Sequence, residues 1–182
     1  MKIQKTRIEG LLEIIPDVFP DNRGQFQESY NKKLYKEMGI PTKFVQDNIS
    51  VSYDNVIRGL HYQIVYPQAK LVSCLSGEII DYAVDLRVDS KTFKDYFALR
   101  LSGENHTQLY IPEGFAHGFA VISAPAIVMY KTNNYRFPEY ERGIRPTDPT
   151  LNIIWPYDFP ILSERDKNLP FFTEIFPNDT KD

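Results

Sequence analysis

The segment from Ile57 to Leu71, IRGLHYQIVYPQAKL, carries more reactive side chains than a strand that only packs would need. It places the guanidinium of Arg58, the imidazole of His61 and the ammonium of Lys70 within fifteen positions that otherwise look like β-structure. An imidazole can take and give a proton near neutral pH, and fixed cations stabilise developing negative charge. The pattern predicts a site that binds a negatively charged ligand and moves a proton.

The strand that carries these residues must direct their side chains into one cavity. Strict alternation along a strand would place Arg58 and His61 on opposite faces. A bulge at Gly59 would instead turn Arg58 towards the cavity that His61 faces. Lys70 shares a face with Val72, so its ammonium is buried and functional if that face is interior. Otherwise Lys70 is a rim lysine whose charged head stays in water.

Three more groups could complete such a site. Within Ile111–Phe119, IPEGFAHGF, a turn would return His117 towards the core. Tyr130 stands between apolar and polar neighbours, although a single tyrosine is by default a packing residue. Asp166 follows Ser163, which could cap a short helical turn, although an aspartate there is by default a surface residue.

Length and composition narrow the class of protein. A chain of 182 residues suits one domain, spanning 1–182, that can bury a core without disulfides. A net charge of −3 and a pI near 5.7 give no reason to expect a nucleic-acid or membrane partner. The single cysteine, Cys74, favours a reducing compartment, and the start MKIQKTRIEG lacks the apolar core of a signal peptide. We therefore expect a cytoplasmic protein.

The expected fold is all-β. The chain has 12 Tyr and 12 Phe, and turn-forming Gly and Pro recur between short strand-like runs. This pattern favours a double-sheet jelly roll or a related barrel with one or two short helices. The Pro-rich tail, 167–182, is expected to be irregular. The expected strands lie within residues 3–19, 24–30, 44–52, 70–75, 78–86, 93–101, 108–111, 119–121 and 127–132, and residues 57–71 are expected to be β-structure as a whole.

Two local predictions can be checked directly. The helix is expected over Asn31–Met38, with Asn31 as its N-cap and with Gly39 and Pro41 ending it. The strands on either side of Ser76-Gly77 are expected to form a hairpin around that turn.

A series of motifs resembles a known family. In chain order they read FPDNRGQFQE, FVQDNISVS, RGLHYQ, PQAKLV, GEIIDYAVDLR, KTF, LYIPEGFAHGF, MYK, GI, DP, IIWP and LSERD. Together they resemble the dTDP-4-dehydrorhamnose 3,5-epimerase family of nucleotide-sugar enzymes, from about residue 3 to residue 170.

The resemblance implies a cupin-type jelly roll that forms a homodimer through its N-terminal strands. It implies an isomerase of dTDP-rhamnose and cell-surface polysaccharide biosynthesis, acting without metal or cofactor on a nucleoside-diphosphate 4-keto sugar. It makes His61 the general base, Asp166 its partner and Tyr130 the acid on the opposite face of the ring. Lys70 would stabilise the enolate. Further residues implied to line the site or bind nucleotide and sugar, some reaching the neighbouring subunit's site, are Arg23, Phe26, Glu28, Gln46, Asn48, Arg58, His117 and Glu141.

The chemistry explains these residue types. Removing a proton beside a ketone leaves negative charge on the carbonyl oxygen, and a fixed cation there stabilises the transition state. Inversion also requires the proton to leave one face of the ring and return on the other, so two proton-transfer groups are needed. Guanidinium groups suit a diphosphate because they bind its oxygens bidentately.

The chain departs from the family pattern at three places. Tyr135-Arg136 stands where two aromatics are common, so Arg136 is expected to contact the substrate, or else to be a surface charge. Pro146-Thr147 replaces a tryptophan and an acid, and Arg165 replaces a common lysine. These departures concern the sugar nucleotide more than the proton transfers.

Other functions stay open at this point. Within the class, the enzyme could invert one carbon only, isomerise the ketone, or use a GDP-linked or longer sugar. A metal-dependent cupin oxygenase or isomerase is suggested by the spacing of Pro112, Gly114 and His117, with His61 as a second imidazole. Gln63 stands where a further histidine would be expected, which makes a poor transition-metal set. A non-catalytic sugar-nucleotide binding protein would be expected to lack the base or the acid.

Overall fold

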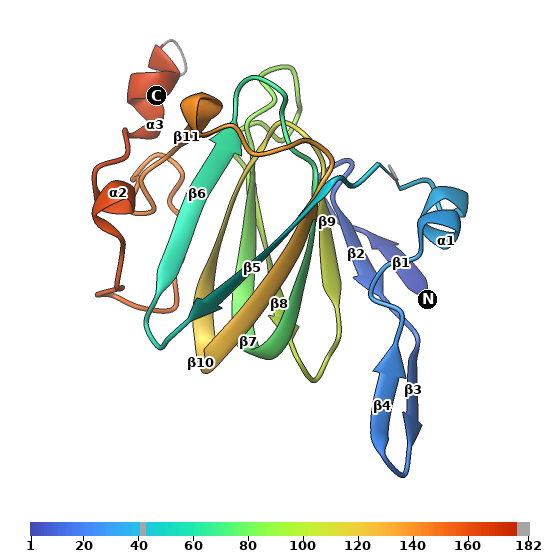
Figure 1. Cartoon of the computed structure of the whole chain (residues 1–182). Helices are drawn as coiled ribbons and strands as arrows, with labels where there is room; N and C mark the ends of the chain where they lie inside the picture. Colours follow the sequence, from blue (N-terminus) through green and yellow to red (C-terminus); the bar gives the residue numbers. More distant parts are fainter. Residues whose placement is uncertain (41–42, 178–182) are drawn as a thin grey trace.

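The computed structural model describes residues 1–40 and 43–177 of the chain. Short helices accompany an extensive antiparallel sheet (Figure 1). The elements are β1 Lys2–Lys5, β2 Leu12–Ile15, β3 Val18–Asp21, β4 Gly24–Gln27, α1 Lys32–Glu37, β5 Gln46–Ser52, β6 Ile57–Gln63, β7 Lys70–Asp85, β8 Tyr96–Ser102, β9 Gln108–Ile111, β10 Phe115–Thr132, the 3₁₀ turn η1 Pro138–Tyr140, β11 Glu141–Gly143, α2 Glu164–Lys167 and α3 Phe172–Ile175.

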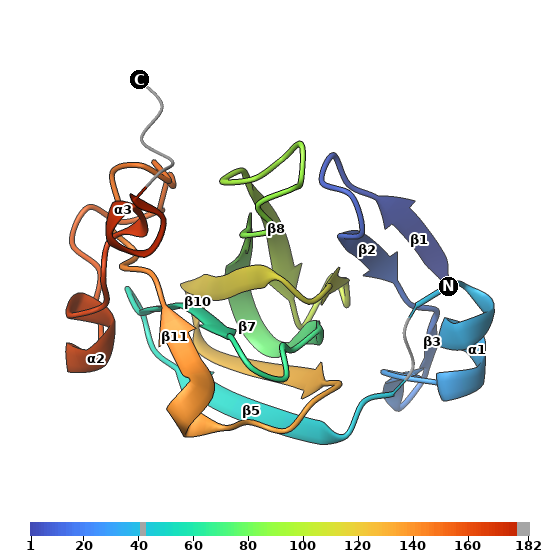
Figure 2. The same ribbon diagram turned by 90° about the horizontal axis from the view of Figure 1, so that it is seen from above.

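Two long strands, β7 and β10, divide the nine-stranded ladder into two facing sheets. The first part of β7 pairs with β9 and its second part with β8, while the first part of β10 pairs with β6 and its second part with β5. Sheet I therefore has the order β1-β2-β9-β7-β10-β5, and sheet II has the order β8-β7-β10-β6-β11. Seen from above, the strands curve around a common interior (Figure 2). This is the expected double-sheet jelly roll.

The prediction of a hairpin around Ser76-Gly77 is wrong. β7 continues through both residues, because each half pairs with β10 rather than with the other half. Gly77 bends the strand at φ +70°, and a Cβ there would lie 2.3 Å from the carbonyl oxygen of Ser123. The two expected strands at 119–121 and 127–132 are likewise parts of β10, whose register with β7 shifts near Ser123. Ser76 and Gly77 therefore bend β7 from one sheet into the other and do not reverse the chain.

The main core fills the space between the sheets. Val72 and Val128 of sheet I meet Ile79 and Phe119 of sheet II there, all of them buried. Their alternation with outward residues is the period of two that a sheet requires.

Helices and loops cover the outer faces of both sheets. The helix predicted near Asn31 is confirmed as α1: the Asn31 side chain caps it, and its buried Tyr35 packs on the outside of sheet I. Pro41 lies outside the described residues. The tail from residue 167 is not irregular throughout, because α3 buries Phe172 against Leu60 on the outside of sheet II.

The hairpin of β3 and β4 forms a separate two-stranded sheet that projects from the barrel (Figure 1). Phe19 and Phe26 lie opposite each other on it and are 57% and 65% exposed. Among the described residues, no helix is long and apolar enough to cross a membrane.

Candidate active site

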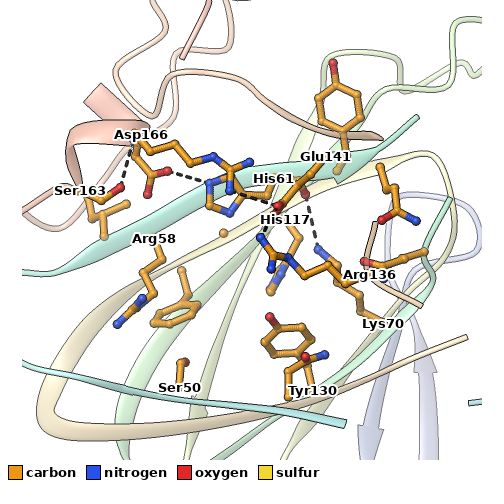
Figure 3. Close-up of a pocket in the computed structure, with 18 of the residues that line it drawn as sticks. Ser50, Arg58, His61, Lys70, His117, Tyr130, Arg136, Glu141, Ser163 and Asp166 are labelled. Carbon is orange, nitrogen blue, oxygen red and sulfur yellow. Dashed lines mark hydrogen bonds and ion pairs between the residues drawn. The ribbon is translucent and has the colours of Figure 1, made fainter. Parts of the chain in front are cut away.

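A cavity of about 470 Å³ lies between the open edges of the two sheets. Side chains of β5, β7 and the second part of β10 form one wall, and those of β6, β11 and the first part of β10 form the other. Helix α2 contributes from the side (Figure 3). Ten of the predicted site residues line it: Gln46, Asn48, Arg58, His61, Lys70, His117, Tyr130, Arg136, Glu141 and Asp166.

A bulge in β6 brings Arg58 and His61 into the same cavity. His61 faces His117 across the ladder, whereas Arg58 faces Phe119, so β6 has one residue more than β10 over this stretch. The extra residue is Gly59, with φ +124°, and a Cβ on it would lie 2.6 Å from the Cα of Gly118. The bulge predicted at Gly59 is therefore present. Strict alternation would have turned Arg58 away.

His61 and Asp166 form a hydrogen-bonded dyad on the wall made by sheet II. The distance between His61 Nε2 and Asp166 Oδ1 is 2.7 Å, and Asp166 is buried although the sequence alone suggested a surface residue. The predicted cap is present, since the amide of Asp166 donates to Ser163 Oγ at 3.1 Å. Burial acts to raise the pKa of the Asp166 carboxyl, but the hydrogen bond and charge of His61, with further hydrogen bonds from Gly59 and Ser163, together outweigh it and the pKa lies below its usual value. An anionic Asp166 orients the imidazole and leaves Nδ1 to meet a substrate.

Lys70 is buried at the inner end of the cavity and is 7% exposed. Its Nζ donates to the carbonyl oxygen of His61 at 3.4 Å and lies 6.0 Å from the ring centroid of Tyr130. Burial lowers the pKa of Lys70 to about 8, although the charges of Asp81 and Glu141 act in the opposite direction. Lys70 is therefore a buried, inward-facing lysine and not a rim lysine whose charged head stays in water.

Tyr130 projects from the wall made by sheet I, opposite the dyad (Figure 3). Burial raises the pKa of the Tyr130 hydroxyl, and the nearby charge of Glu141 adds to the effect. The phenol is therefore protonated at neutral pH. A ring held between the two walls would have an acceptor at His61 on one face and a donor at Tyr130 on the other.

His117 forms a second histidine–carboxylate pair, with a residue that the sequence analysis did not assign. His117 Nε2 lies 2.8 Å from Asp81 Oδ1, and both side chains are buried. Burial lowers the pKa of His117 despite the opposing charge of Asp81. Asp81 lies between apolar Ile79 and Ala83 on the inward face of β7. A carboxylate in such an apolar row is the sequence signal that could have identified Asp81 as a candidate site residue.

Arg165 also belongs to the site, together with Arg136 and Glu141. Oε2 of Glu141 accepts from Arg136 Nη2 at 2.8 Å and from Arg165 Nη1 at 3.1 Å. Burial acts to raise the pKa of the Glu141 carboxyl, but the hydrogen bonds from the two arginines and their positive charges together outweigh it, and the pKa is lowered. The charge of Arg136 is thus part of the cavity and not an isolated surface charge.

Three predicted binding residues lie outside this cavity. Arg23 and Phe26 lie on the β3–β4 hairpin, and Glu28 follows it. All three are exposed, with Arg23 paired to Asp21 at 2.6 Å and Glu28 accepting from Asn31. Their roles at a neighbouring subunit's site remain predictions.

Comparison with known proteins identifies the family of this chain. The sequence profile of the dTDP-4-dehydrorhamnose 3,5-epimerase family matches residues 5–174. The chain belongs to this family. It is 50% identical over 170 residues to a dTDP-4-dehydrorhamnose 3,5-epimerase of Shigella flexneri, covering 92% of this chain and 94% of the relative.

Other members of the dTDP-4-dehydrorhamnose 3,5-epimerase family show how far the likeness extends. A dTDP-6-deoxy-D-glucose-3,5-epimerase of Legionella pneumophila, solved in complex with dTDP-4-keto-L-rhamnose, superposes with a TM-score of 0.91 at 47% identity, covering 93% of this chain and 92% of that one. A dTDP-4-dehydrorhamnose 3-epimerase of Streptomyces niveus is 39% identical, covering 96% of this chain and 85% of the relative.

The metal-dependent cupin alternative is not favoured. The relatives are epimerases, and His61 and His117 each direct Nε2 to a carboxylate. The amide of Gln63 donates to the carbonyl oxygen of Tyr66 at 2.6 Å and accepts from the amide of Phe137 at 2.8 Å, so it holds the backbone. Within residues 1–40 and 43–177, no three His, Cys, Asp or Glu side chains are grouped to hold a metal ion.

Proposed function

We propose that this protein inverts C3 and C5 of dTDP-4-dehydro-6-deoxyglucose and so forms dTDP-4-dehydrorhamnose. As a member of the epimerase family it is an isomerase. The observation that carries the proposal is the placement of His61 and Tyr130 on opposite walls of one cavity, with the buried ammonium of Lys70 near both.

The first step is proton abstraction by His61. Nδ1 takes the proton from the carbon beside the ketone, and the C–H electron pair moves into the carbonyl to form an enolate. Asp166 stabilises the resulting imidazolium through the 2.7 Å hydrogen bond. Lys70 stabilises the negative oxygen, because its charge sits in a buried site where little water screens it.

The second step is reprotonation from the other face by Tyr130. Its phenolic proton goes to the carbon, which inverts the centre, and the phenolate then regains a proton from solvent. His61, which is 26% exposed, returns its proton to solvent. The same pair can act on C3 and C5 in turn, since both carbons flank the same ketone. The reaction as proposed uses no metal or cofactor.

The nucleotide is proposed to be a dTDP group, as in the named ligand of the Legionella relative. Arg58 supplies a guanidinium in the cavity that suits the diphosphate. Inversion at C3 alone is the alternative, since the Streptomyces niveus relative is a 3-epimerase. The sugar-exchange experiment below separates the two.

We also propose a homodimer in which the β3–β4 hairpin reaches the neighbouring subunit. An isolated two-stranded hairpin is marginally stable in water, yet this one exposes Phe19 and Phe26. A second copy would bury these rings and place Arg23 near an anionic ligand. Light scattering should give twice the chain mass, and Phe26→Ser should shift the protein towards monomer. A monomeric wild type would refute this part.

The proposed setting is the cytoplasm, where the product would supply cell-surface polysaccharide synthesis. The single cysteine, Cys74, is buried and unpaired, which suits a reducing compartment. Fractionation of cells that make the tagged protein should recover it with cytoplasmic markers.

Proton NMR in D₂O tests the reaction. Wild-type protein with dTDP-4-dehydro-6-deoxyglucose should lose both the C3 and the C5 proton signals as deuterium enters. His61→Ala should slow this exchange by about 10²–10⁴-fold. Tyr130→Phe should retain exchange at C3 or C5 while losing inversion, because abstraction needs only the base. Exchange at C3 alone would identify a single-carbon epimerase, and no exchange would refute the proposed function.

A further inference from the structure

Asp81 is a buried acid to which the two proton-transfer steps assign no role. It lies on the inward face of β7 between apolar Ile79 and Ala83, and its side chain is fully buried. Oδ1 of Asp81 lies 2.8 Å from His117 Nε2, whereas Oδ2 is buried and has no hydrogen-bond partner among the described residues. An unpartnered carboxylate oxygen costs free energy in an interior, so packing alone would favour a third apolar residue at this position.

The pair of Asp81 and His117 carries one net negative charge. A carboxylate only accepts hydrogen bonds, so Nε2 of His117 is the donor. Burial lowers the pKa of His117 below its usual value, and the imidazole is therefore neutral at neutral pH. His117 thus orients the carboxylate without cancelling its charge. In the part of the chain that the structure describes, no lysine or arginine forms an ion pair with Asp81.

Lys70 is the buried cation on which this charge acts. Lys70, His117 and Tyr130 gather at the inner end of the cavity (Figure 3), where the Tyr130 ring centroid is 6.2 Å from that of His117 and 6.0 Å from Lys70 Nζ. Among the described residues, Nζ donates one hydrogen bond, to the carbonyl oxygen of His61, and has no ion pair. A buried ammonium without an opposite charge nearby tends to lose its proton.

The other charged groups around Lys70 do not replace Asp81. The ionisable groups that contact Lys70 or interact with its charge are His61 of β6, Asp81 of β7, His117 and Tyr130 of β10 and Glu141 of β11. Glu141 already accepts hydrogen bonds from two arginines, so its negative charge is balanced. The charges of Asp81 and Glu141 both act to raise the pKa of Lys70, and that of Asp81 contributes more.

We propose that Asp81 is a positioning residue of the reaction: held in place by His117, its carboxylate keeps Lys70 in the ammonium form that stabilises the enolate oxygen. The catalytic part of this proposal rests on the proposed function. A neutral amine would offer the developing oxyanion a hydrogen bond without a full positive charge, and it would stabilise the transition state less. Asp81 itself does not line the cavity, so it acts through Lys70.

Carbon-13 NMR of protein labelled at the lysine Cε atoms measures the charge of Lys70 without substrate. The Lys70 signal is the one missing from Lys70→Met, and its titration midpoint should lie at about pH 8 in wild type. In Asp81→Asn the midpoint should fall by about one pH unit, because the variant keeps the shape of the side chain and removes its charge. Glu78→Gln is the matched control, since Glu78 also lies on β7 but pairs with Arg100 at 2.8 Å, and it should leave the midpoint unchanged.

The alkaline limb of kcat/KM should move together with this midpoint. If the midpoint falls by one unit from pH 8, the ratio of kcat/KM between Asp81→Asn and wild type should decrease about fivefold between pH 6 and pH 8. A purely structural role of Asp81 would lower the free energy of unfolding and leave this ratio constant with pH.

A Lys70 midpoint that is the same in Asp81→Asn and wild type would overturn the proposal. If the Asn variant does not fold, Asp81→Ala gives the same test, because it removes the charge and continues the apolar row of Ile79 and Ala83. A shifted midpoint with an unmoved alkaline limb would overturn the catalytic part alone. No exchange of sugar protons by wild type would refute the proposed function, and the titration would still decide whether Asp81 keeps Lys70 protonated.

Discussion

Replacing Lys70 with methionine should abolish activity and yet stabilise the protein at neutral pH. Lys70 is 7% exposed, and burial lowers its pKa from 10.5 to about 8. The folded state therefore carries the penalty of a desolvated ammonium whenever the lysine is protonated. Methionine has a similar length without the charge, so it removes the penalty together with the cation that we propose stabilises the enolate.

The magnitude follows from proton linkage. Between pH 8 and pH 10.5 the unfolded chain keeps the Lys70 proton and the folded chain does not, so the stability of wild type rises with pH through this window. The difference of about 2.5 pKa units corresponds to about 3 kcal/mol. The penalty is fully present below pH 8 and is relieved as the pH approaches 10.5. The stability advantage of Lys70→Met should thus shrink by about 2–3 kcal/mol between pH 7 and pH 10.

Urea unfolding at both pH values, at one fixed protein concentration, measures this difference. Lys91→Met is the control, because Lys91 is exposed on the loop after β7 and its replacement should give no such pH dependence. An advantage of Lys70→Met that stays constant from pH 7 to pH 10 would refute the reasoning. So would a variant less stable than wild type at pH 7 with no trend.

Three further predictions follow from the same geometry. For wild type, kcat/KM should fall about tenfold per pH unit above roughly pH 8 as Lys70 loses its proton. Lys70→Arg, if it retains activity, should remove this alkaline limb of the pH profile. An unchanged limb in Lys70→Arg would assign the titration to another group. Ser163→Ala should lower the unfolding free energy by about 1 kcal/mol by removing the cap of α2, and it should reduce kcat more than KM because Asp166 loses its support; unchanged kinetics would contradict that role. Gly77→Ala should lower the unfolding free energy by more than about 2 kcal/mol, because both φ +70° and a 2.3 Å backbone contact oppose a Cβ. Gly39→Ala, with φ +80° and open space, should lower it by only about 1 kcal/mol, and equal effects would show that the contact at Gly77 is unimportant.

The sequence by itself determined the all-β class, the helix at Asn31 and the membership of the epimerase family, because these depend on local signals. Capping, alternation and turn residues act over a few positions, and motif order is read directly from the chain. The bulge at Gly59 could also be anticipated, since only an extra residue allows Arg58 and His61 to face one cavity.

The tertiary structure alone decided which residues meet. A Ser-Gly pair predicts a turn, but whether the chain folds back or bends between sheets depends on the partner strand, and β10 pairs with both halves of β7. Asp166 is more than one hundred positions from His61, and Asp81 becomes a partner of His117 only when β7 and β10 align. Only the structure shows that Arg136 forms a charged cluster with Glu141 and Arg165. Local energies determine the elements, whereas burial and charge in the site arise from contacts between distant segments.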